Sequence, residues 1–376
     1  MGATLQDYRL VFVGPMLGHS AVGDYAEDIV TAVRPYFGDV AQVRTGGPGE
    51  DTLADARRHR RAVAQLIADA PAGRVLVHAE LSTAAISPFW ATAGLRGVPV
   101  TGTVHDPPQG VWMPARTRFV AKSRLLNHGI HYPARPLSRK LEGAVYRDRT
   151  LFALTETGRQ SIARVYPSTH TRYIPHVVRD RPDITPAHER PRAVGFFGHV
   201  YRGKGFEQIE RLRALLPADI GIRVAGRGTE DLPAIAGVEI LGPVDGAAED
   251  AFFASVRAIV VPYGKRHFYA DSFAASGVVA HATAYCTPQI CTDYAALVEL
   301  DEAAGAVVAR VNQAGAPADS DTVTNALASA ITGLLDDDAR MAELSANSAR
   351  TRQQRSAART GEAFAAAWTE TLGLDG

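Results

Sequence analysis

The sequence predicts an α/β protein with two domains, each built on a parallel β-sheet that helices cover on both faces. The chain has 376 residues, more than one core usually supports. Short apolar runs alternate with helical stretches, and this pattern restarts after a polar, proline-containing stretch at 179–192. Buried apolar strands separated by helices are typical of parallel sheets. Two such sets around a linker indicate two Rossmann-like domains.

The first domain is expected over 1–180, the second over 181–350, and a closing helix over 351–376 within a tail that is Ala-rich from about Asp319. Ligands of open parallel sheets bind beyond the carboxyl ends of the strands, so chemistry is expected just after each run. The predicted strands of the first domain are RLVFVG (9–14), RVLVHAEL (74–81), VPVTGTVHD (98–106), LFALTET (151–157) and TRYIPHVV (171–178). Those of the second are AVGFFGH (193–199), IGIRVAG (220–226), VEILGPV (238–244), RAIVVPY (257–263) and PQICTD (288–293).

The composition, 46% hydrophobic and 21% charged, is ordinary for a soluble globular protein. No apolar run reaches the roughly 20 residues that span a membrane, and the first residues resemble a strand more than a signal peptide. Only two cysteines occur, Cys286 and Cys291, without a Cys-x-x-Cys pair. A disulfide framework or a zinc site is therefore not expected, and a reducing cytoplasm fits. The richness in arginine and alanine hints at a high-GC bacterium.

The zero net charge hides an asymmetry between the two halves. Residues 1–180 carry 22 basic and 15 acidic side chains, whereas 181–376 carry 18 and 25. Most of the positive excess lies in 115–149, with nine basic and two acidic residues. Such a patch attracts an anionic acceptor or an anionic membrane surface, although a solvated helical face is the plainer alternative. No nucleic-acid-binding motif accompanies it, so nucleic acid is not an expected partner.

A glycine-rich turn, GHVYRGKG, follows the predicted strand AVGFFG and precedes the predicted helix FEQIERLRALL (206–216). Its spacing from Gly198 to Lys204 matches the phosphate loop of nucleotide triphosphatases, but Gly205 stands where that loop has a magnesium-binding Ser or Thr. A glycine-rich turn with one lysine before a helix can stabilise a diphosphate without a metal. The alternative is a strand-to-helix turn with an exposed lysine.

A second anion-binding element is expected where a helix opens in FAASGVVAHA (273–282). Ser276 and Gly277 lie in its first turn, where a hydroxyl and unpaired N–H groups meet an anion. The alternative is a capped helix buried between two strands.

The order and spacing of these motifs resemble the family-four retaining nucleotide-sugar glycosyltransferases of the GT-B fold. The resemblance covers nearly the whole chain. It implies two Rossmann-like domains whose parallel sheets face each other across a cleft, and a closing helix with Trp368 that returns to the first domain. Motifs that carry it are VGFFGHVYRGKGFEQ, IRVAGRG, VEILGPV, RAIVVPY and ATAYCTPQICTD in the second half, and GPMLGHSAVGDYAEDI, TGTVHDPP and YIPHVV in the first.

The resemblance implies roles for individual residues. Lys204 would bind the donor diphosphate and His105 would contact the transferred sugar, which makes both candidate catalytic residues. His105 is alternatively a partly buried histidine bonded to Asp106. Asp106 is expected on the acceptor side. The remaining donor-binding candidates are Gly18, His19, Ser20, His199, Arg202, Gly242, Val244, Ser276, Gly277 and His281.

The chain departs from the family at three positions. His199 stands where an arginine is usual, and Arg202 is the candidate replacement. The family's Glu-x7-Glu pair would fall on Phe273 and His281, and neither is acidic. Asp271 is the candidate substitute for contacts with sugar hydroxyls, and His281 for a hydrogen bond to the ribose.

The implied activity is retaining transfer of a hexose-type sugar from a UDP- or GDP-sugar to a hydroxyl of a small-molecule, glycan or lipid acceptor. The leaving phosphate would take the acceptor proton, and neither a metal nor a cofactor is expected. A cytoplasmic location, or one peripheral to the inner face of the membrane, is expected.

Two other GT-B proteins remain as alternatives: a catalytically silent binder of nucleotide sugars, and a sugar-nucleotide epimerase, which needs carboxylates in its cleft. A nicotinamide dehydrogenase fits poorly, because GPMLGHSAVGDY lacks the G-x-G-x-x-G fingerprint.

Overall fold

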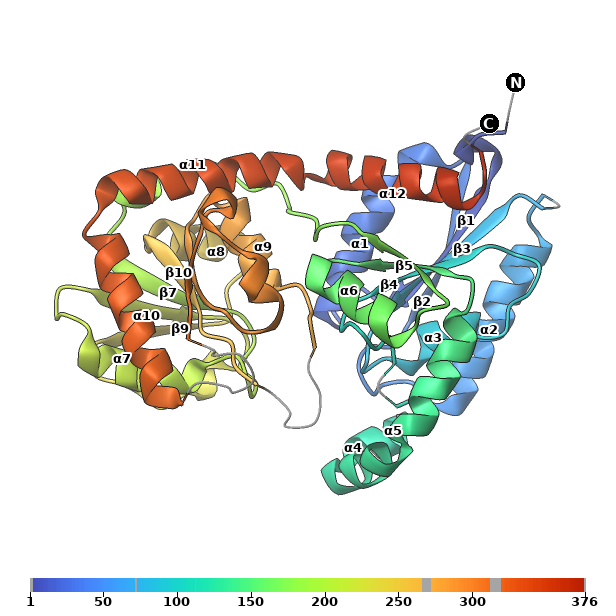
Figure 1. The fold of residues 1–376 in the computed structure, drawn as a ribbon, viewed down its shortest axis with the longest axis horizontal. Helices are drawn as coiled ribbons and strands as arrows, with labels where there is room; N and C mark the ends of the chain where they lie inside the picture. The colour runs from blue at the N-terminus through green and yellow to red at the C-terminus, as the bar shows by residue number, and fades with distance from the viewer. Residues whose placement is uncertain (1–2, 72, 112, 266–271, 312–318, 375–376) are drawn as a thin grey trace. The chain divides into compact units, whose positions relative to one another are not determined.

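The computed structural model describes residues 3–71, 73–111, 113–265, 272–311 and 319–374 (Figure 1). The chain divides into two compact units. Unit 1 comprises Met1–Val177, Ser272–Ala275 and Ala357–Gly376, and unit 2 comprises Val178–Asp271 and Ser276–Ser356. Each unit holds a six-stranded sheet in which all strands are parallel, with helices on its faces. The predicted α/β class with two parallel sheets is therefore confirmed.

The sheet of unit 1 has the strand order β2-β1-β3-β4-β5-β6. Its central strands are almost entirely buried, as expected for a parallel sheet covered on both faces. The strands are β1 (Arg9–Pro15), β2 (Asp39–Thr45), β3 (Val75–Leu81), β4 (Val100–Val104), β5 (Thr150–Ala153) and β6 (His170–Tyr173). The helices are α1 (Ala21–Val33), α2 (Leu53–Ala68), α3 (Ile86–Thr92), α4 (Arg118–Lys122), α5 (Arg124–Tyr146), α6 (Glu156–Val165) and α12 (Ala357–Thr371).

Two cores lie on opposite faces of this sheet, because successive side chains of a strand point to opposite faces. Leu10 and Phe12 of β1 pack with side chains of α1 and α12. Val11 and Val13 pack with side chains of α2, α3, α5 and α6. Helix α12 lies against α1 (Figure 1). Its Trp368 is fully buried and donates from Nε1 to the Thr101 hydroxyl at 3.2 Å.

The sheet of unit 2 has the order β12-β11-β10-β7-β8-β9. Ala258 and Val260 of β10 join a core with α7, α10 and α11, whereas Ile259 and Val261 join one with α8 and α9. The strands are β7 (Ala193–Phe197), β8 (Gly221–Ala225), β9 (Val238–Gly242), β10 (Ala258–Val261), β11 (Gln289–Thr292) and β12 (Ala306–Ala309). The helices are α7 (Ile209–Leu215), α8 (Gly246–Ala254), α9 (Gly277–Ala284), α10 (Ser320–Leu335) and α11 (Asp338–Gln354).

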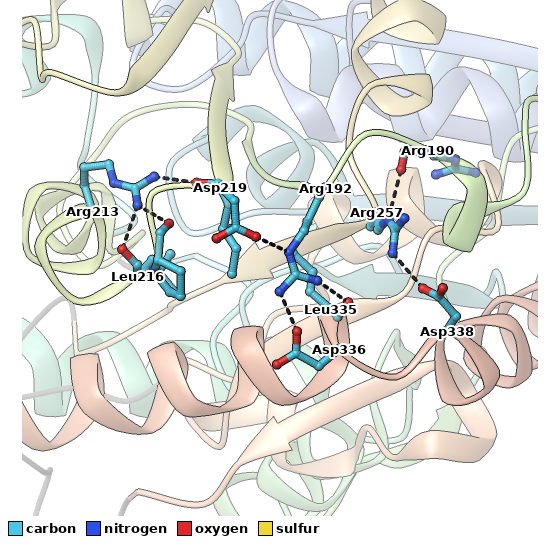
Figure 2. A network of polar contacts seen from close by, with 11 residues as sticks. Arg190, Arg192, Arg213, Leu216, Asp219, Arg257, Leu335, Asp336 and Asp338 are labelled. Carbon is cyan, nitrogen blue, oxygen red and sulfur yellow. Dashed lines mark hydrogen bonds and ion pairs between the residues drawn. The ribbon is translucent and has the colours of Figure 1, made fainter.

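Arginines fix the amino-terminal edge of this second sheet to the helices (Figure 2). Arg192, just before β7, donates to Asp219 at 2.8 Å, to Asp336 and to the Leu335 carbonyl, both at the end of α10. Arg257, just before β10, donates to the Arg190 carbonyl at 2.9 Å and to Asp338 of α11 at 2.7 Å. The opposite, carboxyl edge is the one at which open parallel sheets bind ligands.

Three details differ from the sequence prediction. Strands β2 and β12, each at the edge of its sheet, were not predicted. The segment after Gly205 begins with a 3₁₀ turn, Phe206–Gln208, and α7 follows only from Ile209. The α-helix therefore begins three residues later than the predicted start at Phe206. Within the part of the chain that the structure describes, no helix combines the length and the apolarity needed to cross a membrane.

Candidate functional site

Glycine-containing turns follow β7, β8 and β9 at the carboxyl edge of the unit 2 sheet. The Gly198 amide donates to the Ala225 carbonyl at 3.0 Å, and the Gly226 amide donates to the Gly242 carbonyl at 2.8 Å. A Cβ on Gly226 would lie 2.1 Å from the Gly198 carbonyl oxygen, and its φ is +130°. Only glycine fits there, so these turns form one continuous backbone surface.

Lys204 lies in the turn after β7 and meets two aromatic rings. Its Nζ is 3.7 Å from the centroid of the Tyr263 ring and 5.1 Å from that of Tyr201. Its turn packs directly on the chain after β10: a Cβ on Gly205, whose φ is +79°, would lie 2.1 Å from the Pro262 carbonyl oxygen. The lysine therefore lies beside two aromatic rings at the carboxyl edge of the sheet.

Ser276 is the N-cap of α9, and Gly277 is the first residue of the helix. The Ser276 hydroxyl accepts from the Val279 amide at 3.3 Å and lies 2.9 Å from the Tyr263 hydroxyl. The N-terminus of a helix carries a partial positive charge and unpaired amide groups. Through Tyr263, the structure thus brings together Lys204 and the start of α9.

His281, one turn further along α9, is held by a buried carboxylate that the sequence analysis missed. Its Nδ1 lies 2.7 Å from Oε1 of Glu249 on α8, and its ring packs on Phe197 with centroids 5.1 Å apart. Glu249 is 4% exposed, and its other oxygen accepts from Arg181 at 2.9 Å. A carboxylate only accepts, so Nδ1 is the donor in this contact and Nε2 is the nitrogen that Glu249 leaves for another partner.

The other predicted residues of unit 2 lie in turns and at a strand end. His199 and Arg202 are exposed in the turn that carries Lys204. Gly242 ends β9 with φ +74°, and Val244 packs at the margin of the core beneath α8 and α9. Asp271 lies outside the described residues. Phe273 belongs to unit 1, where its amide donates to the Pro107 carbonyl at 2.9 Å and its carbonyl accepts from Thr155 at 2.7 Å.

His105 follows β4 in unit 1, and its partner is Glu80 on β3. His105 Nε2 lies 2.7 Å from Glu80 Oε2, and the carboxylate is fully buried. The other Glu80 oxygen is 3.3 Å from Nε2 of His78, which is also fully buried. Burial works to raise the pKa of Glu80, but hydrogen bonds from His105 and His78 outweigh it and lower the pKa to about 2. Glu80 is therefore an anion between two imidazoles.

The alternative of a His105–Asp106 hydrogen bond is wrong. The Asp106 carboxylate instead accepts from the Thr83 amide at 3.1 Å and from the Thr83 hydroxyl at 2.9 Å. It therefore fixes the turn after β3. The ring of His105 packs edge-on against Tyr25, with centroids 4.9 Å apart.

Gly18, His19 and Ser20 lie between β1 and α1. The Gly18 amide donates to Asp24 at 2.9 Å, and Ser20 is the N-cap of α1, accepting from Gly23 at 3.1 Å. His19 Nδ1 lies 2.8 Å from Glu50 in the turn after β2. The Gly47 amide and the His19 ring hold the pKa of Glu50 below its ordinary value. Two neighbouring strand ends are thus tied by a hydrogen bond that the sequence did not indicate.

Among the residues that the structure describes, no three His, Cys, Asp or Glu side chains form a group that could hold a metal ion. At the carboxyl edge of unit 2, Lys204 places a cation beside the rings of Tyr201 and Tyr263, which suits an anion.

Neither a family model nor a curated protein matches the chain in sequence. Solved structures are similar in fold. HepE from Anabaena, in complex with UDP and glucose, has a TM-score of 0.61 at 12% identity, over 96% of this chain and 100% of HepE. AviGT4, a glycosyltransferase involved in avilamycin A biosynthesis, has a TM-score of 0.57 at 13% identity, over 97% of this chain and 98% of AviGT4.

TarM has a TM-score of 0.56 at 12% identity over 85% of this chain, and the chain spans 58% of TarM's length. With two parallel six-stranded sheets and these relatives in structure, the protein has the two-domain α/β fold of the GT-B glycosyltransferases.

Proposed function

We propose that the protein is a glycosyltransferase that moves a sugar from a nucleotide diphosphate donor to a hydroxyl of an acceptor. One observation carries this proposal: the Lys204 ammonium and the N-cap of α9 both contact Tyr263 at the carboxyl edge of the unit 2 sheet. A cation and a helix N-terminus are both suited to a diphosphate. The fold supports the assignment, since HepE has been solved with UDP-glucose.

The proposed chemistry is electrostatic. As the bond between the sugar and the diphosphate breaks, negative charge grows on the leaving phosphate. Lys204 and the first amides of α9 stabilise that charge, and Arg202 is the candidate for a further cation. We propose a UDP- or GDP-hexose as donor, retention at the sugar carbon, and no requirement for a metal. The leaving phosphate would take the acceptor proton.

Two histidines are proposed to contact other parts of the donor. Because Glu249 fixes Nδ1–H of His281, Nε2 is able to accept a hydrogen bond from a ribose hydroxyl. Because Glu80 engages Nε2 of His105, Nδ1 is the nitrogen proposed to meet a hydroxyl of the transferred sugar. The Gly18–Ser20 turn, His199 and the backbone at Gly242–Val244 are proposed as further donor contacts, and Asp106 is proposed on the acceptor side.

The acceptor is proposed to be anionic or carried by a membrane. No acidic residue occurs between Asp106 and Glu142. The described surface of α4 and α5 combines cations with apolar side chains, since Phe119 and Leu137 are 75% and 71% exposed. In Figure 1, α4 and the first half of α5 extend away from the sheet of unit 1. Such a surface is suited to anionic headgroups.

The lack of carboxylates at 273 and 281 favours one second candidate, a nucleotide-sugar binder that does not catalyse transfer. The two are separated by incubating the protein with UDP-, GDP-, ADP- and dTDP-sugars and a panel of hydroxyl acceptors, with and without EDTA. Release of the nucleoside diphosphate supports a transferase, and binding without release supports the silent binder. If no donor is bound or consumed, both are wrong. Loss of activity with EDTA would contradict the metal-free reaction.

The matched variants are Lys204→Ala and Arg211→Ala. Lys204→Ala is expected to lower turnover by about 10²-fold or more, the scale for removing one group that stabilises the developing charge. Arg211 is an exposed cation of the same unit, paired with Asp321 at 3.0 Å, and its loss is expected to leave turnover unchanged. Equal rates for wild type and Lys204→Ala would mean that the turn after β7 does not bind the diphosphate.

A further inference from the structure

Tyr263, two residues beyond the end of β10, joins three segments that are far apart in the sequence. Its ring lies under the Lys204 ammonium, at 3.7 Å from Nζ to the centroid. Its hydroxyl lies 2.9 Å from the hydroxyl of Ser276, the N-cap of α9. It is the last residue of the motif RAIVVPY, but neither the sequence analysis nor the function proposed above assigns its side chain a role.

The backbone around Tyr263 is fixed on both sides. The Tyr263 carbonyl accepts from the Thr292 hydroxyl, at the end of β11, at 2.7 Å. The next amide, Gly264, donates to the Gly203 carbonyl at 3.0 Å. Because β7, β10 and β11 are adjacent parallel strands, their carboxyl ends hold the tyrosine in place. The ring therefore has a defined position from which to orient Lys204.

The contact between Tyr263 and Lys204 is a cation–π contact. The face of an aromatic ring attracts the ammonium without cancelling its charge. Burial raises the pKa of Tyr263, so the phenol is neutral at physiological pH. Tyr263 thus holds a cation close to the partial positive end of a helix, an arrangement that favours an anion in the same place.

We propose that Tyr263 is a positioning residue of the donor site, which sets Lys204 with its ring and the α9 N-terminus with its hydroxyl toward one phosphate group. The inference rests on the proposed function, since it needs a nucleoside diphosphate as ligand. Beyond that function, it assigns Tyr263 as the side chain through which Lys204 and the N-terminus of α9 act on the same phosphate.

The test uses the full chain and isothermal titration with UDP, GDP and ADP, taken separately. Tyr263→Leu removes the ring and is expected to weaken binding of the nucleotide that wild type prefers by about three- to thirtyfold. Tyr263→Phe keeps the ring but loses the hydrogen bond to Ser276, and a smaller loss is expected. In the transfer reaction, kcat should fall more than the donor KM rises, because the phosphate gains charge in the transition state.

A double-mutant cycle separates positioning from simple destabilisation. In a Lys204→Met background, Tyr263→Leu is expected to have much less effect on nucleotide binding than in wild type, since the ring acts through the lysine. Tyr201→Leu, which removes the more distant ring, is the matched control and should cost less than Tyr263→Leu. Fully additive losses, or wild-type affinity in Tyr263→Leu, would overturn the inference.

Further outcomes distinguish failure of the Tyr263 inference from failure of the proposed function. If Tyr263→Leu does not fold, Tyr263→Phe and Ser276→Ala are compared, and an unchanged kcat in both overturns the inference. If wild type binds none of the three nucleotides, the proposed function fails and the inference fails with it. A wild type that binds while the Tyr263 variants bind equally well overturns the inference alone.

Discussion

Glu142 on α5 is expected to make unit 1 less stable as pH rises through neutrality. Its carboxyl is 1% exposed and accepts from the amides of Gly110 and Val111, both at 2.9 Å. The hydroxyls of Tyr166 and Tyr146 approach it at 2.6 and 3.3 Å. Burial raises the pKa of Glu142 from 4.5 to about 7, even though these four donors favour the charged form.

The direction and size of this pH dependence of the free energy of unfolding follow from proton linkage. A carboxyl whose pKa is higher in the folded state stabilises the fold below its unfolded pKa, and this contribution is lost as pH rises through the folded value. The window therefore runs from about 4.5 to about 7. At about 1.4 kcal/mol per pH unit, the free energy of unfolding should fall by about 2–3 kcal/mol between pH 5 and pH 8.

The comparison is between wild type and Glu142→Gln. Glutamine keeps an acceptor for the two amides and a donor for the Tyr166 oxygen, so the fold is expected to persist without the pH dependence. All three tryptophans, Trp90, Trp112 and Trp368, fall in the residue ranges of unit 1, so tryptophan fluorescence in urea reports this unit. The exposed Glu362→Gln in α12 is the control. Parallel pH dependence in wild type and Glu142→Gln would refute the reasoning.

Two further predictions concern Glu80 and the α4–α5 surface. Glu80→Gln should lower the free energy of unfolding more at pH 7 than at pH 3, as measured by urea titration. The lowered pKa of Glu80 stabilises the fold above about pH 4.5, and that contribution is lost as pH falls toward 2. An equal loss at both pH values would contradict an ionised Glu80. Phe119→Ser with Leu137→Ser should reduce sedimentation with phosphatidylglycerol vesicles, which salt should also weaken, while the exposed Leu215→Ser of unit 2 should not. Equal sedimentation with phosphatidylcholine vesicles would argue against recognition of anionic headgroups.

Most of the strands that the sequence predicted are buried on both faces. All seven residues of β3 are buried, and so is each residue of β10, so continuous apolar runs marked them. The two missed strands are edges: β2 reads DVAQVRT, with only two of its seven residues buried, and β12 has four residues. Edge position alone does not explain the miss, because the edge strands β6 and β9 were predicted from the runs TRYIPHVV and VEILGPV although most of their residues are partly or fully exposed.

The candidate site was predictable where the signal was local. The glycines around Lys204 and the serine before α9 are features of single turns, and they led to residues that the structure brings together. Glu80, Glu249 and Tyr263 were missed because each acts on a partner from another segment: Glu80 is 25 positions from His105, and Glu249 is 32 from His281. No local pattern encodes such a pair; only the packing of strands and helices creates it.

The partners of three candidate site residues, His105, His281 and Lys204, form a consistent arrangement. His105 and His281 each have one ring nitrogen 2.7 Å from a buried carboxylate. The carboxylate fixes that nitrogen and leaves the other ring nitrogen for a ligand. The Lys204 ammonium instead lies over the Tyr263 ring, at 3.7 Å from Nζ to the centroid. In the proposed function the two histidines recognise hydroxyls and the lysine stabilises a leaving phosphate, so each histidine needs a fixed ring nitrogen and the lysine needs a fixed position. The Tyr263 and Lys204 variants are therefore the most informative pair to measure, because they test the contacts that join the lysine to the N-cap of α9.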